Sequence, residues 1–209
     1  MNLNLAEISQ WLEIFKKTIT TIPANKKVIL APSLPYLGLM AELAKTKGLY
    51  LAAQNVSIME KGAHTGETGI FQVKDFCEYS IVGHSELKEP FDVSIKKRDL
   101  CIADDIIPIM CFVQLDDAKK AYAPSSLVTW EDPTNISVNG QYRAKSDVEI
   151  QRGIDTIRQK IPKEAPLIYG GSVNRQNIET LAKINGLNGV LVGNASNDAA
   201  HFAELVIKF

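Results

Sequence analysis

His84 stands where a histidine could take part in catalysis. It follows Gly83 and the apolar run 79–82, and Ser85 and Glu86 come directly after it. At the carboxyl end of a buried strand, a neutral imidazole can donate a hydrogen bond to a carbonyl group that becomes polarised during a reaction. A structural histidine, or a helix cap formed by Ser85, explains the same pattern equally well.

Glu131 is a second candidate, as a general base. It directly follows the apolar run 127–130. A carboxylate at a strand end can take up a proton when it is partly withdrawn from water, although such residues are more often only solvated or bonded to a nearby amide. The segment 133–140 that follows is long enough to form a lid, with Ile136 as its large apolar residue.

Two loops that contain glycine predict a phosphate site. Residues 169–174 lead from a strand into a helix that begins near Asn174, and residues 190–196 follow another strand, with Ser196 or Asn197 as the cap of the last helix. Glycines allow sharp turns and leave backbone N–H groups at helix starts able to face an anion. Each loop alone is better explained as a tight turn, but the pair favours phosphate, which barrels often bind after their last two strands.

Seven short apolar runs place these loops in an α/β fold. A helix capped by Asn4, with Glu7 at its third position, comes first. The runs that follow lack strict alternation, which is typical of parallel strands covered on both faces, and most are separated by helix-like segments. The sequence contains no linker, so we expect a single domain over residues 1–209. The predicted strands are 27–31, 50–53, 79–82, 107–112, 127–130, 167–169 and 190–192.

The composition argues against several classes of function. The chain has 209 residues, of which 45% are hydrophobic, and its 23 basic and 24 acidic residues leave a net charge of −1. This charge gives no general reason to bind nucleic acid or an anionic membrane. The longest apolar run, 106–113, is too short to span a bilayer, and residues 1–20 lack a signal-peptide pattern. We therefore expect a cytoplasmic protein with neither nucleic-acid nor membrane partners.

The histidines and cysteines form no metal-binding pattern. No two of the three histidines have metal-ligand spacing, and the three cysteines contain no C-x-x-C pair. We expect no metal site and no disulfide framework, and we expect the thiols to be reduced and at least partly buried. The residues concerned are His64, His84, His201, Cys77, Cys101 and Cys111.

Residues 82–86 (VGHSE) and 169–174 (YGGSVN) resemble two signature segments of the triosephosphate isomerase family. Four further groups of residues agree with the family in order and spacing. The resemblance covers nearly the whole chain and implies an α/β TIM (β/α) barrel. The four further groups are 31–37, 53–67, 108–111 and 189–196.

The resemblance also implies an activity. Members of the family interconvert dihydroxyacetone phosphate and glyceraldehyde 3-phosphate by Glu-mediated proton transfer through an enediolate, in glycolysis and gluconeogenesis, with no metal or organic cofactor. By position in the motifs, Glu131 matches the base and His84 the electrophile. Thr65 lies in the loop that reaches the neighbouring subunit, so a homodimer is implied.

Further positions carry over from the family in three groups. Phosphate-binding backbone is implied at Ser172, Gly193 and Asn194, and lid contacts to the substrate at Ile136 and Ser137. Leu191 matches an apolar residue packed over the base. Supporting positions beside the site are Ser85, Glu86 and Cys111.

Departures from the family pattern bear on activity. The family begins with a strand that ends in Asn-x-Lys, and this lysine contacts the phosphate and the enediolate; Met1 and Asn2 resemble the residues after it. The lid is also rewritten, and Asn194 replaces a glycine. A complete barrel typically takes about 250 residues, so we expect an incomplete barrel of seven parallel strands that lacks the first strand. Because the lysine of that strand is then missing, we expect weakened activity. The alternatives are a non-catalytic sugar-phosphate-binding or structural relic, or a natural chain that carries the first strand ahead of Met1.

Overall fold

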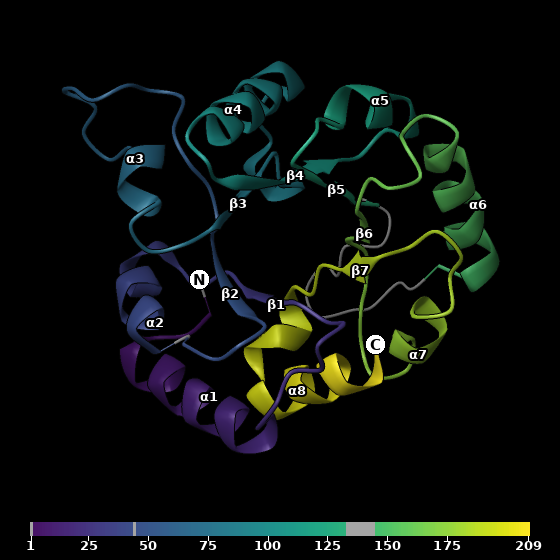
Figure 1. Cartoon of the computed structure of the whole chain (residues 1–209), viewed down its shortest axis with the longest axis horizontal. Helices are drawn as coiled ribbons and strands as arrows, with labels where there is room; N and C mark the ends of the chain where they lie inside the picture. The colour runs from purple at the N-terminus through teal and green to yellow at the C-terminus, as the bar shows by residue number, and fades with distance from the viewer. Residues whose placement is uncertain (1, 44, 133–144) are drawn as a thin grey trace. The chain divides into compact units, whose positions relative to one another are not determined.

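Seven parallel strands alternate with helices along the chain (Figure 1). The computed structural model describes residues 2–43, 45–132 and 145–209. All seven predicted strands are confirmed, with the last one slightly earlier than predicted. The strands are β1 (Val28–Leu30), β2 (Leu49–Ala53), β3 (Tyr79–Val82), β4 (Ile107–Phe112), β5 (Leu127–Trp130), β6 (Leu167–Tyr169) and β7 (Gly189–Val190).

Helices follow most of the strands, and several are only one turn long. After β6 the helix begins at Ile178, later than the predicted start near Asn174. The α-helices are α1 (Leu5–Thr18), α2 (Leu37–Leu43), α3 (Ile70–Val73), α4 (Phe91–Ala103), α5 (Ala118–Ala121), α6 (Asp147–Arg158), α7 (Ile178–Leu181) and α8 (Ala199–Lys208). The 3-10 helices are η1 (Leu34–Tyr36), η2 (Ser85–Leu87), η3 (Leu115–Asp117) and η4 (Asn194–Asn197).

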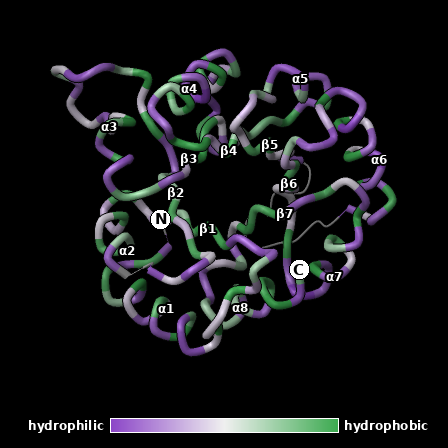
Figure 2. The backbone as a smooth tube through the Cα atoms, in the orientation of Figure 1, coloured by the Kyte–Doolittle hydropathy of each residue, from purple (hydrophilic) through white to green (hydrophobic). Residues whose placement is uncertain are grey.

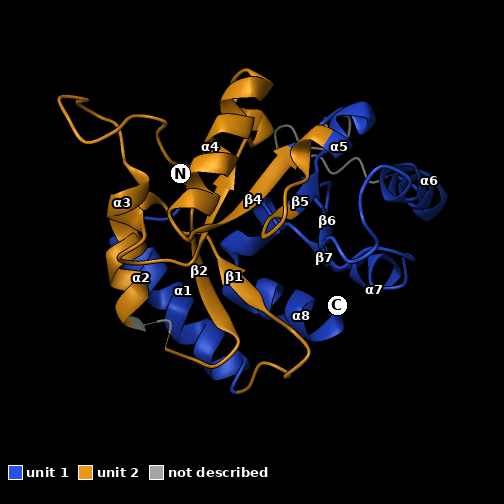
Figure 3. Ribbon diagram, turned by 45° about the horizontal axis from the view of Figure 1, so that its top comes forward, with its two compact units in different colours: residues 1–20, 112–119, 128–209 blue, residues 21–111, 120–127 orange. Residues whose placement is uncertain are grey.

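The chain divides into two compact units, shown in different colours in Figure 3. Unit 1 contains residues 1–20, 112–119 and 128–209, and unit 2 contains residues 21–111 and 120–127. Within unit 2, β1 pairs with β2, β2 with β3 and β3 with β4, all in parallel. Within unit 1, β5 pairs with β6 and β6 with β7, also in parallel.

Helix α1 begins as the sequence predicts. Asn4 Oδ1 accepts the Glu7 N–H at 3.1 Å, and a Glu7 carboxylate oxygen accepts the Asn4 N–H at 2.7 Å, so the capping box is confirmed. Hydrophobic and hydrophilic residues alternate along the helix (Figure 2). Its buried face includes Trp11 and Phe15, whose ring centroids are 5.0 Å apart. The ring centroid of Phe202 in α8 lies 6.0 Å from that of Trp11 and 5.7 Å from that of Phe15. This aromatic cluster joins the first and last helices within unit 1.

The strands of unit 2 are buried at most positions, as a parallel sheet with two covered faces requires. Leu51, Ala52 and Ala53 of β2 and Val82 of β3 are all almost fully buried. None of the described helices is long and apolar enough to cross a membrane.

Candidate active site

Glu131 lies at the carboxyl end of β5 in unit 1. Its backbone N–H donates to the Phe112 carbonyl at 2.8 Å, which extends the sheet by one residue beyond β5. The residue is only 1% exposed. The structure therefore places this carboxylate in a buried setting at a strand end, which is where a general base operates in folds with parallel strands.

The side chains around Glu131 show which side of the sheet it faces. A Cβ atom at Gly170 would lie 3.2 Å from both Glu131 Cγ and Thr129 Cγ2, so both side chains lie against the Gly170 backbone. Trp130, between them in sequence, points to the opposite side, because a Cβ atom at Gly153 of α6 would lie 2.2 Å from its ring. Glycine at 153 thus makes room for the indole, and glycine at 170 makes room for the carboxylate.

Asp132, which follows Glu131, is also buried and forms an ion pair with Lys145. The Asp132 side chain is 5% exposed and that of Lys145 is 26% exposed. The Lys145 ammonium also lies 5.6 Å from the centroid of the Trp130 ring. A buried carboxylate is retained only when it is paired, so the lysine offsets much of the cost of burying Asp132.

The loop after β6 presents a buried hydroxyl group. Gly170 donates its N–H to the Trp130 carbonyl at 2.8 Å, and a Cβ atom at Gly171 would lie 2.1 Å from the Tyr169 hydroxyl. Ser172 is 5% exposed, and its Oγ has no hydrogen-bond partner among the described residues. A buried hydroxyl without a partner is unfavourable unless a ligand or water completes it, so this loop is suited to binding a polar group.

The loop after β7 is fixed by hydrogen bonds within the protein and exposes part of its backbone to solvent. Leu191, which is half-buried, donates its N–H to the Tyr169 carbonyl at 2.9 Å. Ser196 donates twice to the Gly193 carbonyl, from its N–H at 2.9 Å and from its Oγ at 2.7 Å. A Cβ atom at Gly193 would meet no atom within 4 Å, and Gly193 and Asn194 are exposed. An incoming group can therefore reach this stretch of backbone.

The cap of α8 differs from the prediction. Asp198 caps the helix, since its Oδ1 accepts the His201 N–H at 2.7 Å. Ser196 and Asn197, which the sequence suggested for this role, belong instead to the 3-10 turn η4. The hydroxyl of Ser196 is bound to Gly193 and so cannot serve as the cap.

His84 lies at the carboxyl end of β3 in unit 2. Its Nδ1 accepts the Glu86 N–H at 3.3 Å, so His84 caps η2, and the alternative in which Ser85 is the cap is wrong. A neutral imidazole whose Nδ1 accepts carries its hydrogen on Nε2. A Glu86 carboxylate oxygen also lies 4.0 Å from His84 Nδ1, so Glu86 faces this nitrogen with both its N–H and its side chain.

Glycine is required just before His84. Gly83 has φ +73°, and a Cβ atom there would lie 2.9 Å from the Ser94 side chain and 3.0 Å from the Cys111 carbonyl. A side chain at this position would therefore be strained by its backbone and would collide with two neighbours. This close approach fixes the path of the chain into His84.

A network of hydrogen bonds lies on α4 and the loops near it in unit 2. Lys97, whose side chain is only 8% exposed, donates to a Glu89 carboxylate oxygen at 2.5 Å and to Asn55 Oδ1 at 2.9 Å. Ser94 Oγ donates to the other Glu89 oxygen at 3.0 Å. Each of these polar groups therefore has a partner inside the protein, which makes the network a structural element.

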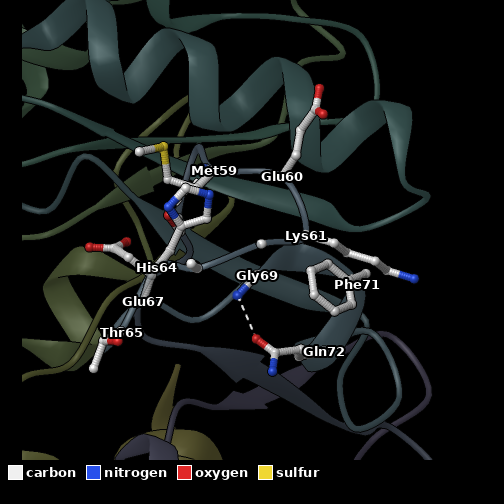
Figure 4. Close-up of a pocket in the computed structure, with 12 residues that line it drawn as sticks. Met59, Glu60, Lys61, His64, Thr65, Glu67, Gly69, Phe71 and Gln72 are labelled. Carbon is white, nitrogen blue, oxygen red and sulfur yellow. Dashed lines mark hydrogen bonds between the residues drawn. The ribbon is translucent and has the colours of Figure 1, made fainter.

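A pocket of about 290 Å³ is formed by the loop between β2 and α3 (Figure 4). Gly69 N–H donates to Gln72 Oε1 at 2.8 Å, and the Lys61 ammonium lies 4.8 Å from the centroid of the Phe71 ring. His64, Thr65 and other exposed residues of the loop line the pocket. Because charges of both signs are mixed here, the pocket does not match the requirements of a phosphate site.

The three cysteines are present as thiols. All three are buried, as predicted. Burial raises the pKa of Cys77 to about 11 and that of Cys101 to about 12, so neither forms a thiolate near neutral pH. Among the described residues, no group of three His, Cys, Asp or Glu side chains could hold a metal ion.

The predicted site residues fall into three sets. The pairing of Lys145 with Asp132 was not predicted, because residues 133–144 separate the two along the chain. Unit 1 holds Glu131, Ser172, Leu191, Gly193 and Asn194; unit 2 holds His84, Ser85, Glu86 and Cys111; Ile136 and Ser137 lie outside the described residues.

Comparison with known proteins identifies the family. A family model described as triosephosphate isomerase matches residues 1–131 and 115–209. A triosephosphate isomerase of Aquifex aeolicus is 27% identical over 100% of this chain and 96% of its own length. The triosephosphate isomerase of Mesomycoplasma hyorhinis is 30% identical over 87% of this chain and 83% of its own length. That of Synechococcus is 29% identical over 98% of this chain and 93% of its own length. With parallel strands, a buried glutamate after β5 and glycine turns after β6 and β7, the chain belongs to the triosephosphate isomerase family, and its fold is of the TIM type.

Proposed function

We propose that the protein is a triosephosphate isomerase that interconverts dihydroxyacetone phosphate and glyceraldehyde 3-phosphate. The observation that carries the proposal is the buried carboxylate of Glu131, which lies at the end of β5 against the backbone of Gly170. The same loop presents the buried Ser172 hydroxyl without a partner among the described residues. The proposed reaction requires a general base close to a site that binds the polar end of the substrate.

Glu131 is the base in the proposed reaction. Its carboxylate takes a proton from the carbon next to the substrate carbonyl and returns that proton to the neighbouring carbon. The Glu131 N–H bond to Phe112 holds its backbone, and Cγ of its side chain lies against the backbone of Gly170. A fixed carboxylate reaches both carbons without having to be oriented anew between the two transfers.

His84 is the electrophile in the proposed reaction. The Nδ1 of its imidazole accepts the Glu86 N–H, so Nε2–H donates to the substrate oxygen on which negative charge develops in the enediolate. Removing one such donor typically costs about 100- to 1,000-fold in turnover. Ser85, Glu86 and Cys111 are proposed to support the position of this histidine.

The phosphate is proposed to be bound by the backbone of Ser172, Gly193 and Asn194, with the buried Ser172 Oγ as a further donor. Backbone N–H groups in glycine turns are suited to a phosphate because they donate without carrying a side chain into the ligand. Leu191 is proposed to pack over the base, and Ile136 and Ser137 to contact the substrate from the segment after Glu131. No metal or organic cofactor takes part in the proposed reaction.

Interconversion of the two triose phosphates, measured at high protein concentration, tests the proposal. The matched control is Glu131→Gln, which keeps the size of the side chain but removes the base, and we expect its activity to be at least about 100-fold lower. Wild-type activity no greater than that of this variant would reject the catalytic assignment. Calorimetry with phosphoglycolate separates the alternative: binding without turnover would identify a sugar-phosphate-binding relic.

We also propose that the protein forms a homodimer through the loop between β2 and α3. Met59 in this loop and Phe71 at the start of α3 are exposed, and a second copy could cover these two apolar side chains. Light scattering tests this, because a strictly monomeric protein at micromolar concentration would contradict it. A role in glycolysis and gluconeogenesis in the cytoplasm follows from the proposed activity.

A further inference from the structure

Trp11 of α1 is bound to the loop after β7. Its indole Nε1–H donates to the Ser196 carbonyl at 2.8 Å, across 185 positions of sequence. The indole is nearly buried and stacks on Phe15, with ring centroids 5.0 Å apart. The direction of this N–H is therefore fixed by packing, and the bond holds η4 to α1 within unit 1.

Ser196 passes this restraint to Gly193. The Ser196 N–H and Oγ both donate to the Gly193 carbonyl, at 2.9 and 2.7 Å. The peptide bond after Gly193 is trans, because the described chain contains no cis peptide. In a trans peptide the N–H points opposite to the C=O, so a Gly193 carbonyl that is held toward Ser196 directs the Asn194 N–H away from the turn.

A side-chain bond also lies in this loop, since Asn197 Nδ2 donates to Asn194 Oδ1 at 3.2 Å. Gly193 and Asn194 are exposed, and a Cβ atom at Gly193 would meet no atom within 4 Å. A backbone that is open on one side keeps its direction only if it is held from the other side. Trp11 and Ser196 hold it there.

We propose that Trp11 is a positioning residue that presets the backbone at Gly193 and Asn194 for an anion. The inference rests on the proposed function, since it assumes that this backbone binds the substrate phosphate. Trp11 does not touch the ligand; it acts through Ser196. Setting the N–H groups before binding strengthens affinity, because the ligand need not order the loop itself.

Binding of phosphoglycolate, measured by calorimetry, tests the role of Trp11. Trp11→Phe keeps an aromatic ring in the cluster but removes the N–H donor. We expect its affinity to be about 3- to 10-fold weaker, which is the range of one net hydrogen bond. The matched control is Phe15→Leu, which disturbs the same cluster while leaving the bond to Ser196, and we expect its affinity to be that of the wild type.

A second variant and a second readout do not depend on the folding of Trp11→Phe. Ser196→Ala removes the Oγ bond to Gly193 and should weaken binding about 2- to 5-fold. The emission of Trp11 in the wild type should change little when phosphoglycolate binds, because its bond to Ser196 is already made in the free protein. A large change would show that the ligand orders the loop and would overturn the positioning role.

The outcomes separate this inference from the proposed function. Wild-type binding together with equal affinity in Trp11→Phe or Ser196→Ala would overturn the positioning role and leave the proposed function standing. The same affinity loss in Phe15→Leu as in Trp11→Phe would also overturn it, because packing alone would then explain the loss. Absence of binding by the wild-type protein would overturn both.

Discussion

The two units satisfy their buried polar groups in different ways. In unit 2, Lys97, Glu89, Asn55 and Ser94 bond to one another, and each has a partner inside the protein. In unit 1, the Oγ of Ser172 and the Oγ1 of Thr129 are buried without a hydrogen-bond partner among the described residues. Burying an unpaired hydroxyl is unfavourable by about 1 to 3 kcal/mol.

This difference bears on where a ligand or a bound water can be accommodated. A polar interior that completes its own hydrogen bonds stabilises the fold and gains nothing from a ligand. A polar interior that is incomplete is less stable alone, and a phosphate or a bound water can complete it. Unit 1 therefore has the features of a binding region, and the network of unit 2 those of a scaffold.

The largest effect is expected from Lys97→Met in unit 2. This change leaves the Glu89 carboxylate buried beside a methyl group, and breaking a buried ion pair in this way costs about 3 to 5 kcal/mol. Urea unfolding measures the loss. Because the network is assigned to the scaffold, phosphoglycolate affinity of the folded fraction should be unchanged.

The double variant Lys97→Met, Glu89→Gln is the control for this prediction. It removes both charges, so it should be more stable than Lys97→Met alone. If Lys97→Met instead weakened binding while leaving stability intact, the network would belong to the site and the contrast between the units would fail.

The second effect tests the ion pair beside the proposed base. Lys145→Met should destabilise the protein by about 1 to 3 kcal/mol, less than Lys97→Met, because the Lys145 side chain is 26% exposed and water screens part of the pair. The methionine keeps an apolar stem near the Trp130 ring. Thermal unfolding measures the loss, and addition of Asp132→Asn should restore part of it. No recovery in the double variant would show that the two side chains are not energetically coupled.

The fold could be predicted from the sequence because its signals are local. Runs such as 79–82 and 107–112 are apolar at nearly every position, and both became strands. The capping box of Asn4 and Glu7 was also predicted correctly, since it depends on two residues three positions apart. The helix after β6 was placed too early, because Asn174 and Asn177 bond within a turn before the helix begins.

The site could be predicted only in part. Glu131 and His84 were predicted from their positions after strands and from resemblance to a family, and the structure places each at the carboxyl end of a strand. The partners that hold such residues are distant in sequence, as Trp11 is from Ser196, and pattern analysis of one sequence contains no signal for them. The cap of the last helix was misjudged for a related reason, since Ser196 is bound to Gly193 and Asp198 takes its place.

The third effect compares two serines, one in each unit. Ser172→Ala removes a buried hydroxyl that lacks a partner among the described residues, so stability should stay constant or rise slightly while phosphoglycolate affinity falls about 2- to 10-fold. Ser94→Ala removes a hydroxyl that donates to Glu89, so stability should fall by about 1 kcal/mol with affinity unchanged. Calorimetry measures the phosphoglycolate affinity of each variant, and urea unfolding measures its free energy of unfolding. Equal behaviour of the two serines would contradict the distinction between the units.

The smallest effect concerns the pH dependence of unit 1. Burial lowers the pKa of His201 below its ordinary value of 6.5, with the nearby charge of Arg175 lowering it further and those of Asp198 and Glu204 opposing the shift. The Nε2 of His201 is buried and has no partner among the described residues, so a protonated ring would leave an N–H unbonded. As the pH falls below 6.5, the unfolded chain binds a proton that the folded chain does not, and stability decreases.

His201→Gln removes this proton uptake and tests the sign of the effect. The stability of the variant relative to the wild type should rise as the pH is lowered from about 8 to about 5, because only the wild type loses the contribution of a neutral histidine. The difference at about pH 8, where histidine is neutral in both states, is the baseline that contains the packing change alone. A difference that stays constant over this range would mean that water or a neighbouring carboxylate reaches the ring. His201 Nε2 would then have a hydrogen-bond partner in the folded protein. The buried polar atoms without a partner among the described residues of unit 1 would be those of Ser172 and Thr129.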